Sequence, residues 1–294
     1  MLIVSFIGFQ NDTIHVSSKN QQLDIVLRDG VELNEVNIVT RKLGTMKLRS
    51  SVMNEDMISS AELSRAACCN LGESFVTNPS VDVSYSDAAT GAKQIKLLGL
   101  SGTYVQMLTE NIPNYRGAAA PYGLGYVPGP WMQSIQVSKG TSSVKNGYEA
   151  ITGQINVEFK KPQLPEADWV SANLFASTTN RYEANADATL KLSKRWSTSL
   201  LAHYENETKA HDGNDDGFVD IPQVEQYNVW NRWAYMGDHY VFQAGIKALS
   251  ETRTSGQANH GGTMHSGDLY KVGIDTERYE FFTKNAYIFN KEKN

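Results

Sequence analysis

This chain of 294 residues has few cysteines, no excess of basic residues and no long apolar run. Its two cysteines, Cys68 and Cys69, are adjacent, which excludes a disulfide framework because a bridge between neighbours would be strained. Lysine and arginine total 27 against 32 acidic residues, a formal net charge of −5, so a general nucleic-acid-binding protein is not expected. No apolar run approaches the roughly 18 residues of a membrane-spanning helix. The sequence also lacks a nucleophile–base pairing, a Walker loop and a dinucleotide fingerprint, so we expect no enzyme.

Apolar residues make up 40% of the chain, enough for a folded core, and the length suits roughly two domains. Residues 1–30 contain three short predicted strands, Leu2–Ile7, Thr13–Val16 and Leu23–Leu27, separated by polar turns. Three strands without a partner sheet make a poor domain, so we expect the remnant of a small β-sandwich here. Residues 31–44 are expected to form a linker.

Residues 45–162 mix helical and strand patterns. Apolar residues at helical spacing predict a helix over Asn54–Val76, which Asn78–Pro79 ends. A run rich in glycine and proline, Pro113 to Pro130, predicts one long loop. Together these patterns predict an α/β domain, with strands at Val81–Tyr85, Gln94–Leu98, Tyr104–Leu108, Ser134–Val137 and Gly153–Phe159.

Residues 163–294 are dominated by a period of two. Between Tyr182 and Leu192, every second residue is apolar and every residue between is polar. Membrane-spanning strands need roughly 9–11 residues, whereas strands of soluble proteins average about 5–6. The pattern predicts six strands of about membrane-spanning length: Trp169–Thr178, Tyr182–Leu192, Trp196–Glu205, Tyr227–Tyr235, Tyr240–Leu249 and Tyr279–Phe289.

Aromatic residues and connection lengths favour a membrane β-barrel over an exposed meander in a soluble protein. The connections at 193–195 and 236–239 are tight, whereas those at about 206–226 and 250–277 are long and polar, as periplasmic turns and outer loops should be. Six strands cannot close a barrel, for which about eight is the smallest number, so we expect a chain truncated at both ends. Aromatic residues gather at strand ends, as in the girdles of outer-membrane barrels: Trp169, Tyr182, Trp196, Tyr204, Tyr240, Tyr279 and Phe289.

The segment Ile135–Val157 resembles the last part of the plug domain of TonB-dependent outer-membrane receptors. Upstream, Asn70–Phe75 followed by Asn78–Val81 is similar to a second motif of the family, and Thr109–Pro113 lies where a third usually stands. The resemblance covers about residues 35–160. It implies an α/β plug domain followed by an incomplete antiparallel transmembrane β-barrel. The positions that match the closing motif of the plug are Lys139, Gly140, Gly147, Gly153, Ile155 and Asn156.

The flanks of the plug-like segment agree with this resemblance. Residues 1–30 are similar to the end of the carboxypeptidase-regulatory-like domain that precedes many such receptors in the Bacteroidetes. Leu98-Gly99 is a departure, because many plugs have an Arg-Gly there that packs the plug against the barrel. The stretch that resembles the TonB box consists of Glu35, Val36, Asn37, Ile38, Val39 and Thr40. TonB would bind it as an added β-strand, and a plain linker strand is the alternative.

The resemblance implies active import of a scarce solute, such as a metal chelate, haem, cobalamin or metal ion. The location would be the outer membrane of a Gram-negative bacterium, with outer-membrane lipid around the barrel. TonB and its inner-membrane energising complex would be the partners, and no cofactor is required. Candidate ligand-binding side chains on the plug are Tyr115, Arg116, Tyr122 and Tyr126, which offer flat apolar faces and hydrogen-bond donors. Alternatively, these aromatic rings only pack the loop against the barrel wall.

A loop between two barrel strands has the spacing of a calcium site. Asp212, Asn214 and Asp216 lie two residues apart, Gly217 follows, and Asp220 comes four residues after Asp216. This matches the first half of an EF-hand loop, in which oxygen ligands at alternate positions wrap one cation. Position twelve is Gln223 instead of a bidentate glutamate, so calcium affinity should be modest. A solvated turn rich in aspartate and glycine is the alternative.

Two other functions stay open at this point. An oligosaccharide importer of the starch-utilisation type shares the plug and the N-terminal extension, but Thr141–Gly147 matches its usual closing motif poorly. A soluble carbohydrate-binding β-protein with an α/β domain is the other, and it should stay monodisperse without detergent.

Overall fold

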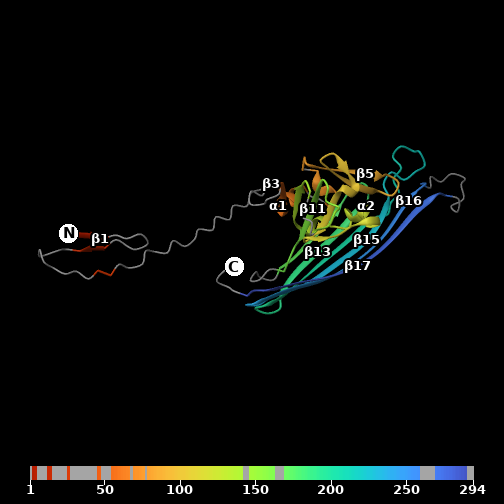
Figure 1. Cartoon of the computed structure of the whole chain (residues 1–294). Helices are drawn as coiled ribbons and strands as arrows, with labels where there is room; N and C mark the ends of the chain where they lie inside the picture. The colour runs from red at the N-terminus through yellow and green to blue at the C-terminus, as the bar shows by residue number, and fades with distance from the viewer. Residues whose placement is uncertain are drawn as a thin grey trace, which may run out of the picture. The chain divides into compact units, whose positions relative to one another are not determined.

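A computed structural model describes residues 2–4, 12–14, 25–26, 45–47, 54–66, 69–76, 78–141, 146–162, 169–258 and 269–289. The chain divides into two units, Met1–Lys42 and Leu43–Asn294 (Figure 1). Among the described residues, no helix is long and apolar enough to cross a membrane.

The first unit contains a pair of short antiparallel strands, β1 (Leu2–Val4) and β2 (Asp12–Ile14). These confirm the first two predicted strands over the described residues. The third is wrong where it can be compared, because Ile25 and Val26 lie outside any strand. Val26 is 82% exposed, so no neighbouring sheet covers its side chain. The TonB-box-like stretch, residues 35–40, lies outside the described residues, and the sandwich remnant stays a prediction.

In the second unit, residues 45–162 form two sheets and several short helical turns. The smaller sheet joins β5 (Val81–Asp87), β6 (Ala92–Leu97) and β7 (Leu100–Ser101). In the larger sheet, β8 and β11 run parallel and the other pairs are antiparallel. Its order is β3 (Thr45–Lys47), β4 (Asn54–Ser59), β10 (Met132–Lys139), β11 (Gly153–Phe159), β8 (Val105–Thr109) and β9 (Ile112–Pro113). All five strands predicted for this region are therefore confirmed.

The helix predicted over Asn54–Val76 is wrong for most of its length. Residues Asn54–Ser59 form β4, and the helix α1 is confined to Ser60–Arg65, followed by a 3₁₀ turn at Glu73–Phe75. Strand β4 lies between β3 and β10, where Ile58 is the register partner of Ile135, and both side chains are fully buried. Pairing with two neighbours in the sheet therefore overrides the local helical pattern. The second short helix, α2, covers Ala120–Gly123, within the predicted loop.

The C-terminal part is one antiparallel sheet in which each strand pairs with the next along the chain. All six predicted strands are present, and the sheet is open, with β12 and β17 as its edges. Figure 1 shows the domain formed by residues 45–162, which we call the plug after the family that it resembles, lying against this long, curved sheet. The strands are β12 (Trp169–Ala176), β13 (Tyr182–Lys191), β14 (Trp196–Glu207), β15 (Gln223–Met236), β16 (Tyr240–Gly256) and β17 (Lys271–Tyr287).

The last three strands are longer than predicted. Strand β15 begins at Gln223, β16 runs to Gly256 and β17 begins at Lys271, so the connections shrink to residues 208–222 and 257–270. The added segments pair in regular register, but polar residues such as Thr252 and Asp275 take the outward positions there. The alternation of apolar and polar residues stops at these polar positions, whereas the pairing of the backbones continues, so the sequence pattern underestimates the length of the strands.

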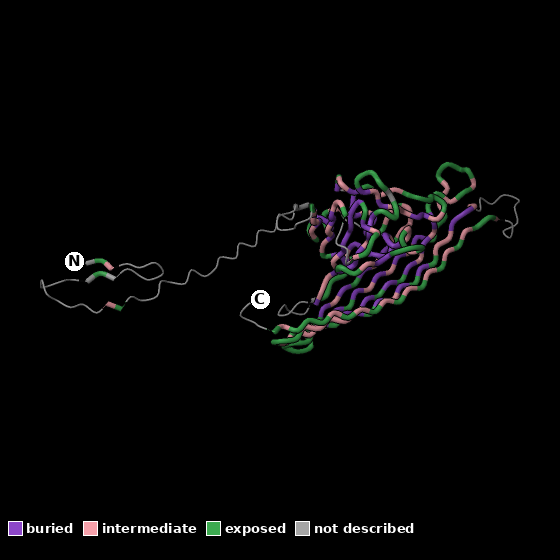
Figure 2. Tube along the Cα trace, in the orientation of Figure 1, coloured by how far each residue is buried: buried purple, intermediate pink, exposed green. Residues whose placement is uncertain are grey.

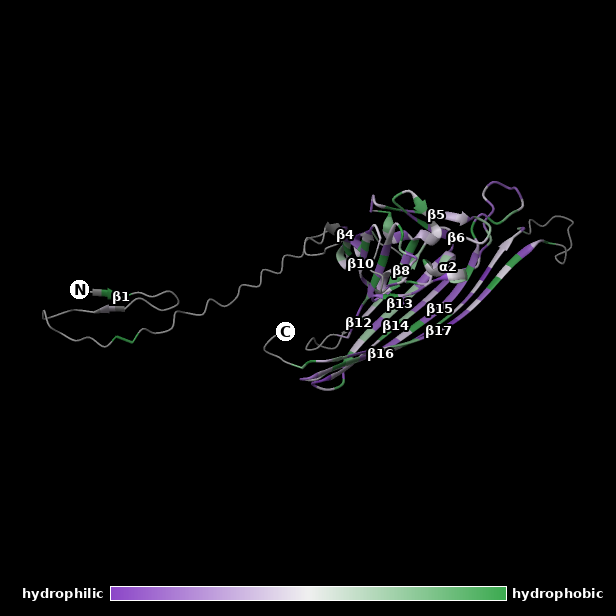
Figure 3. Cartoon of the chain, viewed as in Figure 1, coloured by the Kyte–Doolittle hydropathy of each residue, from purple (hydrophilic) through white to green (hydrophobic). Residues whose placement is uncertain are grey.

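The sheet is polar on its inner face and apolar on its outer face. In β13, Glu183, Asn185 and Asp187 are buried, whereas Tyr182 and Leu190 are about half exposed. Buried residues alternate with more exposed ones along β13, β14 and β15 (Figure 2), and hydropathy alternates along the sheet (Figure 3). Apolar residues point away from the protein and polar residues point toward the plug, which is the arrangement of a membrane barrel filled by a plug.

A small apolar core joins the plug to the inner face of the sheet. Trp131, Ile135, Ile155 and Phe159 of the plug are at most 1% exposed and belong to the same cluster as Trp230 of β15. The rings of Phe159 and Trp230 meet edge to face, with centroids 4.4 Å apart. This core sets the position of the plug, and polar side chains surround it.

Candidate solute site between plug and barrel

A cavity of about 370 Å³ lies where the plug meets the barrel sheet. Its plug side is lined by residues of β5, β6 and the α2 region, among them Lys93 and Tyr122. Its barrel side is lined by the ends of β14, β15 and β16 and by the connections at 177–181 and 208–222. The longer connection of the two, residues 208–222, therefore lies at the same end of the sheet as the cavity.

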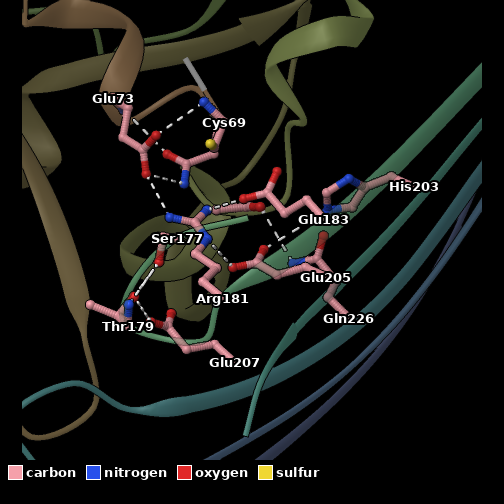
Figure 4. Close-up of polar contacts among 12 residues, drawn as sticks. Cys69, Glu73, Ser177, Thr179, Arg181, Glu183, His203, Glu205, Glu207 and Gln226 are labelled. Carbon is pink, nitrogen blue, oxygen red and sulfur yellow. Dashed lines mark hydrogen bonds and ion pairs between the residues drawn. The ribbon is translucent and has the colours of Figure 1, made fainter. Parts of the chain in front are cut away.

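Arg181 is the centre of an ion-pair group in this cavity (Figure 4). Its guanidinium lies 2.9 Å from Glu73 of the plug, 2.6 Å from Glu183 and 3.0 Å from Glu205. Glu183 and Glu205 are direct register partners on β13 and β14, so their carboxylates would repel each other without a cation. Arg181 therefore offsets two barrel carboxylates and at the same time binds one from the plug.

Glu73 is held by its own chain as well as by Arg181. Its carboxylate accepts hydrogen bonds from the backbone N–H of Cys69 and from Asn70 Nδ2, both at 3.0 Å. Burial alone would raise the pKa of Glu73, but the Arg181 charge and these hydrogen bonds outweigh it and lower that pKa. Burial raises the pKa of the Cys69 thiol, and the charges of Glu183 and Glu73 add to this effect, so the thiol stays protonated.

A second anchor holds the opposite side of the plug. Glu110 lies in the tight turn between β8 and β9 and pairs with Arg232 of β15, through the Nη1–Oε1 contact and an Nη2–Oε2 contact of 3.0 Å. Lys284 of β17 lies 3.2 Å from the same carboxylate. The side chains of Arg232 and Glu110 are only 2% and 3% exposed. If one partner were removed, water could not solvate the charge that remained. Leu98, where many plugs have an arginine, is 62% exposed.

Two of the predicted ligand-binding tyrosines are buried between plug and barrel. Tyr115 is 4% exposed, and its hydroxyl accepts a hydrogen bond of 2.9 Å from Lys247 of β16. Tyr126 is 1% exposed and donates to Thr276 Oγ1 of β17 at 3.2 Å. Burial raises the pKa of both hydroxyls, so they stay neutral. Their geometry matches the alternative in which the aromatic rings pack the loop against the wall.

The other two predicted ligand-binding residues lie in different cavities. Tyr122 lines the cavity at the barrel, with the Arg253 guanidinium 5.4 Å from its ring centroid. Arg116 lines a second cavity, of about 630 Å³, on the surface of the plug. There it forms a bidentate ion pair with Glu149, at 2.7 and 2.8 Å. Of the four residues, Tyr122 is therefore the one on the wall of the cavity between plug and barrel.

Sequence reasoning missed most charged residues of the site. Lys93 belongs to no motif, and Glu73 lies in the family-like motif at Asn70–Phe75 but was not identified as a site residue. Arg181, Glu205 and Arg253 belong to a region in which polar residues alternate with apolar ones. One usable signal was present, because charged residues on the polar face of a barrel strand must point at the plug or at the lumen.

The predicted calcium residues form a hydrogen-bonded turn. Asp212 accepts from the backbone N–H of Gly217 at 2.8 Å, Asp216 from that of Phe218 at 2.8 Å, and Asp220 from that of Gly213 at 2.6 Å. Asn214 Nδ2 donates to Asp216 Oδ2 at 3.0 Å. Within the described part of the chain, no group of three or more acidic, histidine or cysteine side chains converges as metal ligands would. Calcium at this loop stays a prediction.

Comparisons with known proteins agree with this architecture. Residues 47–154 match the family model of the TonB-dependent Receptor Plug Domain. The vitamin B12 transporter BtuB of Vibrio vulnificus (strain CMCP6) is 24% identical over 185 residues, which cover 63% of this chain and 30% of the relative.

Solved structures of outer-membrane receptors resemble the chain in fold. The ferripyoverdine receptor of Pseudomonas aeruginosa matches with a TM-score of 0.63 and 14% identity, over 82% of this chain and 32% of that one. The siderophore receptor PiuA of Acinetobacter baumannii matches with a TM-score of 0.61 and 14% identity, over 81% and 34%. The chain spans about a third of the length of these proteins.

Proposed function

We propose that this chain, whose residues 47–154 match the plug domain of TonB-dependent receptors, takes part in the active import of a scarce solute across the outer membrane of a Gram-negative bacterium. The observation that carries the proposal is the cavity of about 370 Å³ between the plug and the outer end of the barrel sheet. A solute bound there touches both parts at once, so movement of the plug changes its surroundings. The proposed solutes are a metal chelate, haem, cobalamin or a metal ion.

The polar contact between plug and barrel supports a plug that can be displaced. Its ion pairs, such as Glu73 with Arg181, join charged groups that water can solvate again once they separate. An interface made only of apolar side chains would oppose such a movement along its whole area. The mixed interface therefore suits a plug that closes the barrel at rest and yields to a pull.

We propose TonB as the source of this pull, bound at Glu35, Val36, Asn37, Ile38, Val39 and Thr40. An extended peptide of this kind can add a strand to the edge of a partner sheet, where main-chain hydrogen bonds supply the affinity. The inner-membrane complex would energise TonB, and outer-membrane lipid would cover the apolar face of the sheet.

Solute uptake by living cells tests the proposed function. Cells with and without the gene are compared for uptake of radiolabelled cobalamin, ferric siderophores, haem and copper, each supplied at a limiting concentration. We expect at least one of these solutes to accumulate faster in cells that carry the gene, and an uncoupler of the inner membrane to abolish the difference. Uptake that is equal in both strains for every solute, or unaffected by the uncoupler, would contradict the proposal.

We also propose that the loop around Asp212, Asn214, Asp216 and Asp220 binds calcium with modest affinity, on the strength of its ligand spacing. Calcium should raise the thermal unfolding midpoint of the detergent-solubilised chain. The variant Asp216→Ala should lose that increase, whereas Asp238→Asn, in a different connection, should keep it. If calcium leaves the unfolding midpoint unchanged, the proposed calcium site is contradicted.

A further inference from the structure

The cavity between plug and barrel contains charges that the protein does not neutralise itself. Seven charged side chains line it: Glu73, Lys93, Arg181, Glu205, Glu207, Glu251 and Arg253. Five of them belong to the ion-pair groups centred on Arg181 and Arg253. The other two, Glu207 and Lys93, form no ion pair with any residue that the structure describes.

Glu207 is a buried acceptor at the end of β14. It is 8% exposed, and one carboxylate oxygen accepts a hydrogen bond of 3.3 Å from Thr179 Oγ1. Among the described residues, none donates a hydrogen bond to its second carboxylate oxygen. Glu207 lies on the wall of the cavity. A carboxylate that has lost most of its water and forms no ion pair is costly, and the nearby Arg181 charge offsets this cost only in part. A cationic group in the cavity would remove that cost.

Lys93 is the matching unpaired cation on the plug. Its ammonium lies 5.5 Å from the ring centroid of Tyr85, and the structure records no other contact for it in the part of the chain that it describes. Burial lowers the pKa of Lys93, and the Glu73 charge opposes this only in part. An anion in the cavity would stabilise the charged form of this amine.

We propose that the solute, or the end of it that enters this cavity, is zwitterionic, with a positive group held by Glu207 and a negative group held by Lys93. The inference rests on the proposed import function and names the solute class. Because Glu207 belongs to the barrel and Lys93 to the plug, one molecule that satisfies both links the two parts. A cavity of about 370 Å³ is at the small end of ligand sites, so it takes a small molecule or one arm of a larger one.

The walls of the cavity agree with a zwitterion of this size. The rings of Tyr85, Tyr122 and Phe175 line it together with two prolines, Pro121 and Pro222. Aromatic faces attract an ammonium group and also cover the apolar part of a ligand. The charges that are already paired leave no further free group for a second ion. The arrangement therefore selects a molecule by the separation of its two charges.

Short peptides test the inference, because their two ends carry opposite charges at an adjustable distance. The probes are radiolabelled dialanine, trialanine and tetra-alanine, each also with an acetylated amine or an amidated carboxylate. Equilibrium binding is measured on outer membranes from cells that carry the gene, without an energy source. We expect one free peptide to bind at least about tenfold more tightly than either of its blocked forms, since each blocked end loses a charged partner.

Two conservative variants assign the two ends. Glu207→Gln should abolish the preference for the free amine, and Lys93→Gln should abolish the preference for the free carboxylate. Asp238→Asn and Lys194→Gln, exposed in tight connections away from the cavity, are the matched controls and should retain both preferences. Equal affinity for all forms, no measurable binding of any peptide, or preferences that survive both cavity variants would overturn the inference.

The outcomes separate this inference from the proposed function. Peptide binding that depends on Glu207 and Lys93, without energised uptake of any solute, would keep the site and refute import. Energised uptake that Glu207→Gln and Lys93→Gln leave unchanged would keep import and refute the zwitterion site.

Discussion

At the scale of single residues, buried charges fix the plug to the barrel. Glu110 forms ion pairs with Arg232 and Lys284. In the closer pair, the side chains of Arg232 and Glu110 are 2% and 3% exposed. Removing one partner leaves the other charge buried and uncompensated, which typically costs about 3–5 kcal/mol. The exposed pair between Arg195 and Asp238, at 2.9 Å, is worth at most about 1 kcal/mol because water screens it.

Glu110→Ala should therefore lower the free energy of unfolding by about 3–5 kcal/mol, and Asp238→Ala by less than about 1 kcal/mol. The free energy of unfolding of each variant is measured by denaturant titration of the detergent-solubilised chain, with tryptophan fluorescence as the signal. The matched control removes an ion pair of similar length at an exposed site. Equal effects of the two variants would show that burial does not strengthen the Glu110 anchor.

The lowered pKa of Glu73 leads to a prediction of how acid affects the stability of the protein. Its pKa is lowered from 4.5 in the folded protein, so its contribution to stability is present above that value and is lost as the pH falls through the lower folded value. Thermal unfolding midpoints measured from neutral to acidic pH should fall less steeply for Glu73→Gln than for the unchanged chain. Parallel pH profiles of the two proteins would contradict this role of Glu73.

At the scale of elements, the direction of each strand residue decides what a substitution costs. Ile246 and Ser250 both point outward from β16; Ile246 is 62% exposed and lies within the apolar alternation, whereas Ser250 lies where the outward positions become polar. A lysine on the lipid face costs roughly 2–4 kcal/mol at the membrane centre and about 0–1 kcal/mol near its surface. Ile246→Lys should therefore destabilise the protein in lipid vesicles far more than Ser250→Lys does.

Unfolding of the two variants in phospholipid vesicles, followed by denaturant titration, provides the measurement. Repeating it in a micelle, where depth is poorly defined, serves as the control and should reduce the difference. A larger effect of Ser250→Lys would mean that the sheet does not cross the membrane in the inferred direction.

Strands were easier to predict from sequence than helices or ion pairs. Alternation revealed β13 because successive side chains of a strand point to opposite faces, which depends on local sequence alone. The helix predicted at Asn54–Val76 failed because β4 gains two neighbours in the sheet that the local pattern does not contain. The pair between Glu73 and Arg181 joins residues 108 positions apart, so no spacing signals it.

At the scale of the whole molecule, the plug is held at several separate points. Glu73 binds the first barrel connection, Glu110 binds β15 and β17, and Tyr115 binds β16. Each contact is local, so a pull on one end of the plug can break them one after another. The account therefore needs a force applied at the N-terminal side of the plug, and the stretch at residues 35–40 is the proposed handle.

Substitution of this handle tests the central claim, TonB-dependent import, most directly. Neighbouring residues of a strand direct their N–H groups to opposite sides, so either Asn37→Pro or Ile38→Pro must remove a hydrogen bond to an added partner strand. The measurement is energised uptake of the solute identified in the panel, with Asn37→Ala as the control. The account predicts that at least one proline variant abolishes uptake and retains solute binding, whereas Asn37→Ala retains both. Full energised uptake in both proline variants would contradict it.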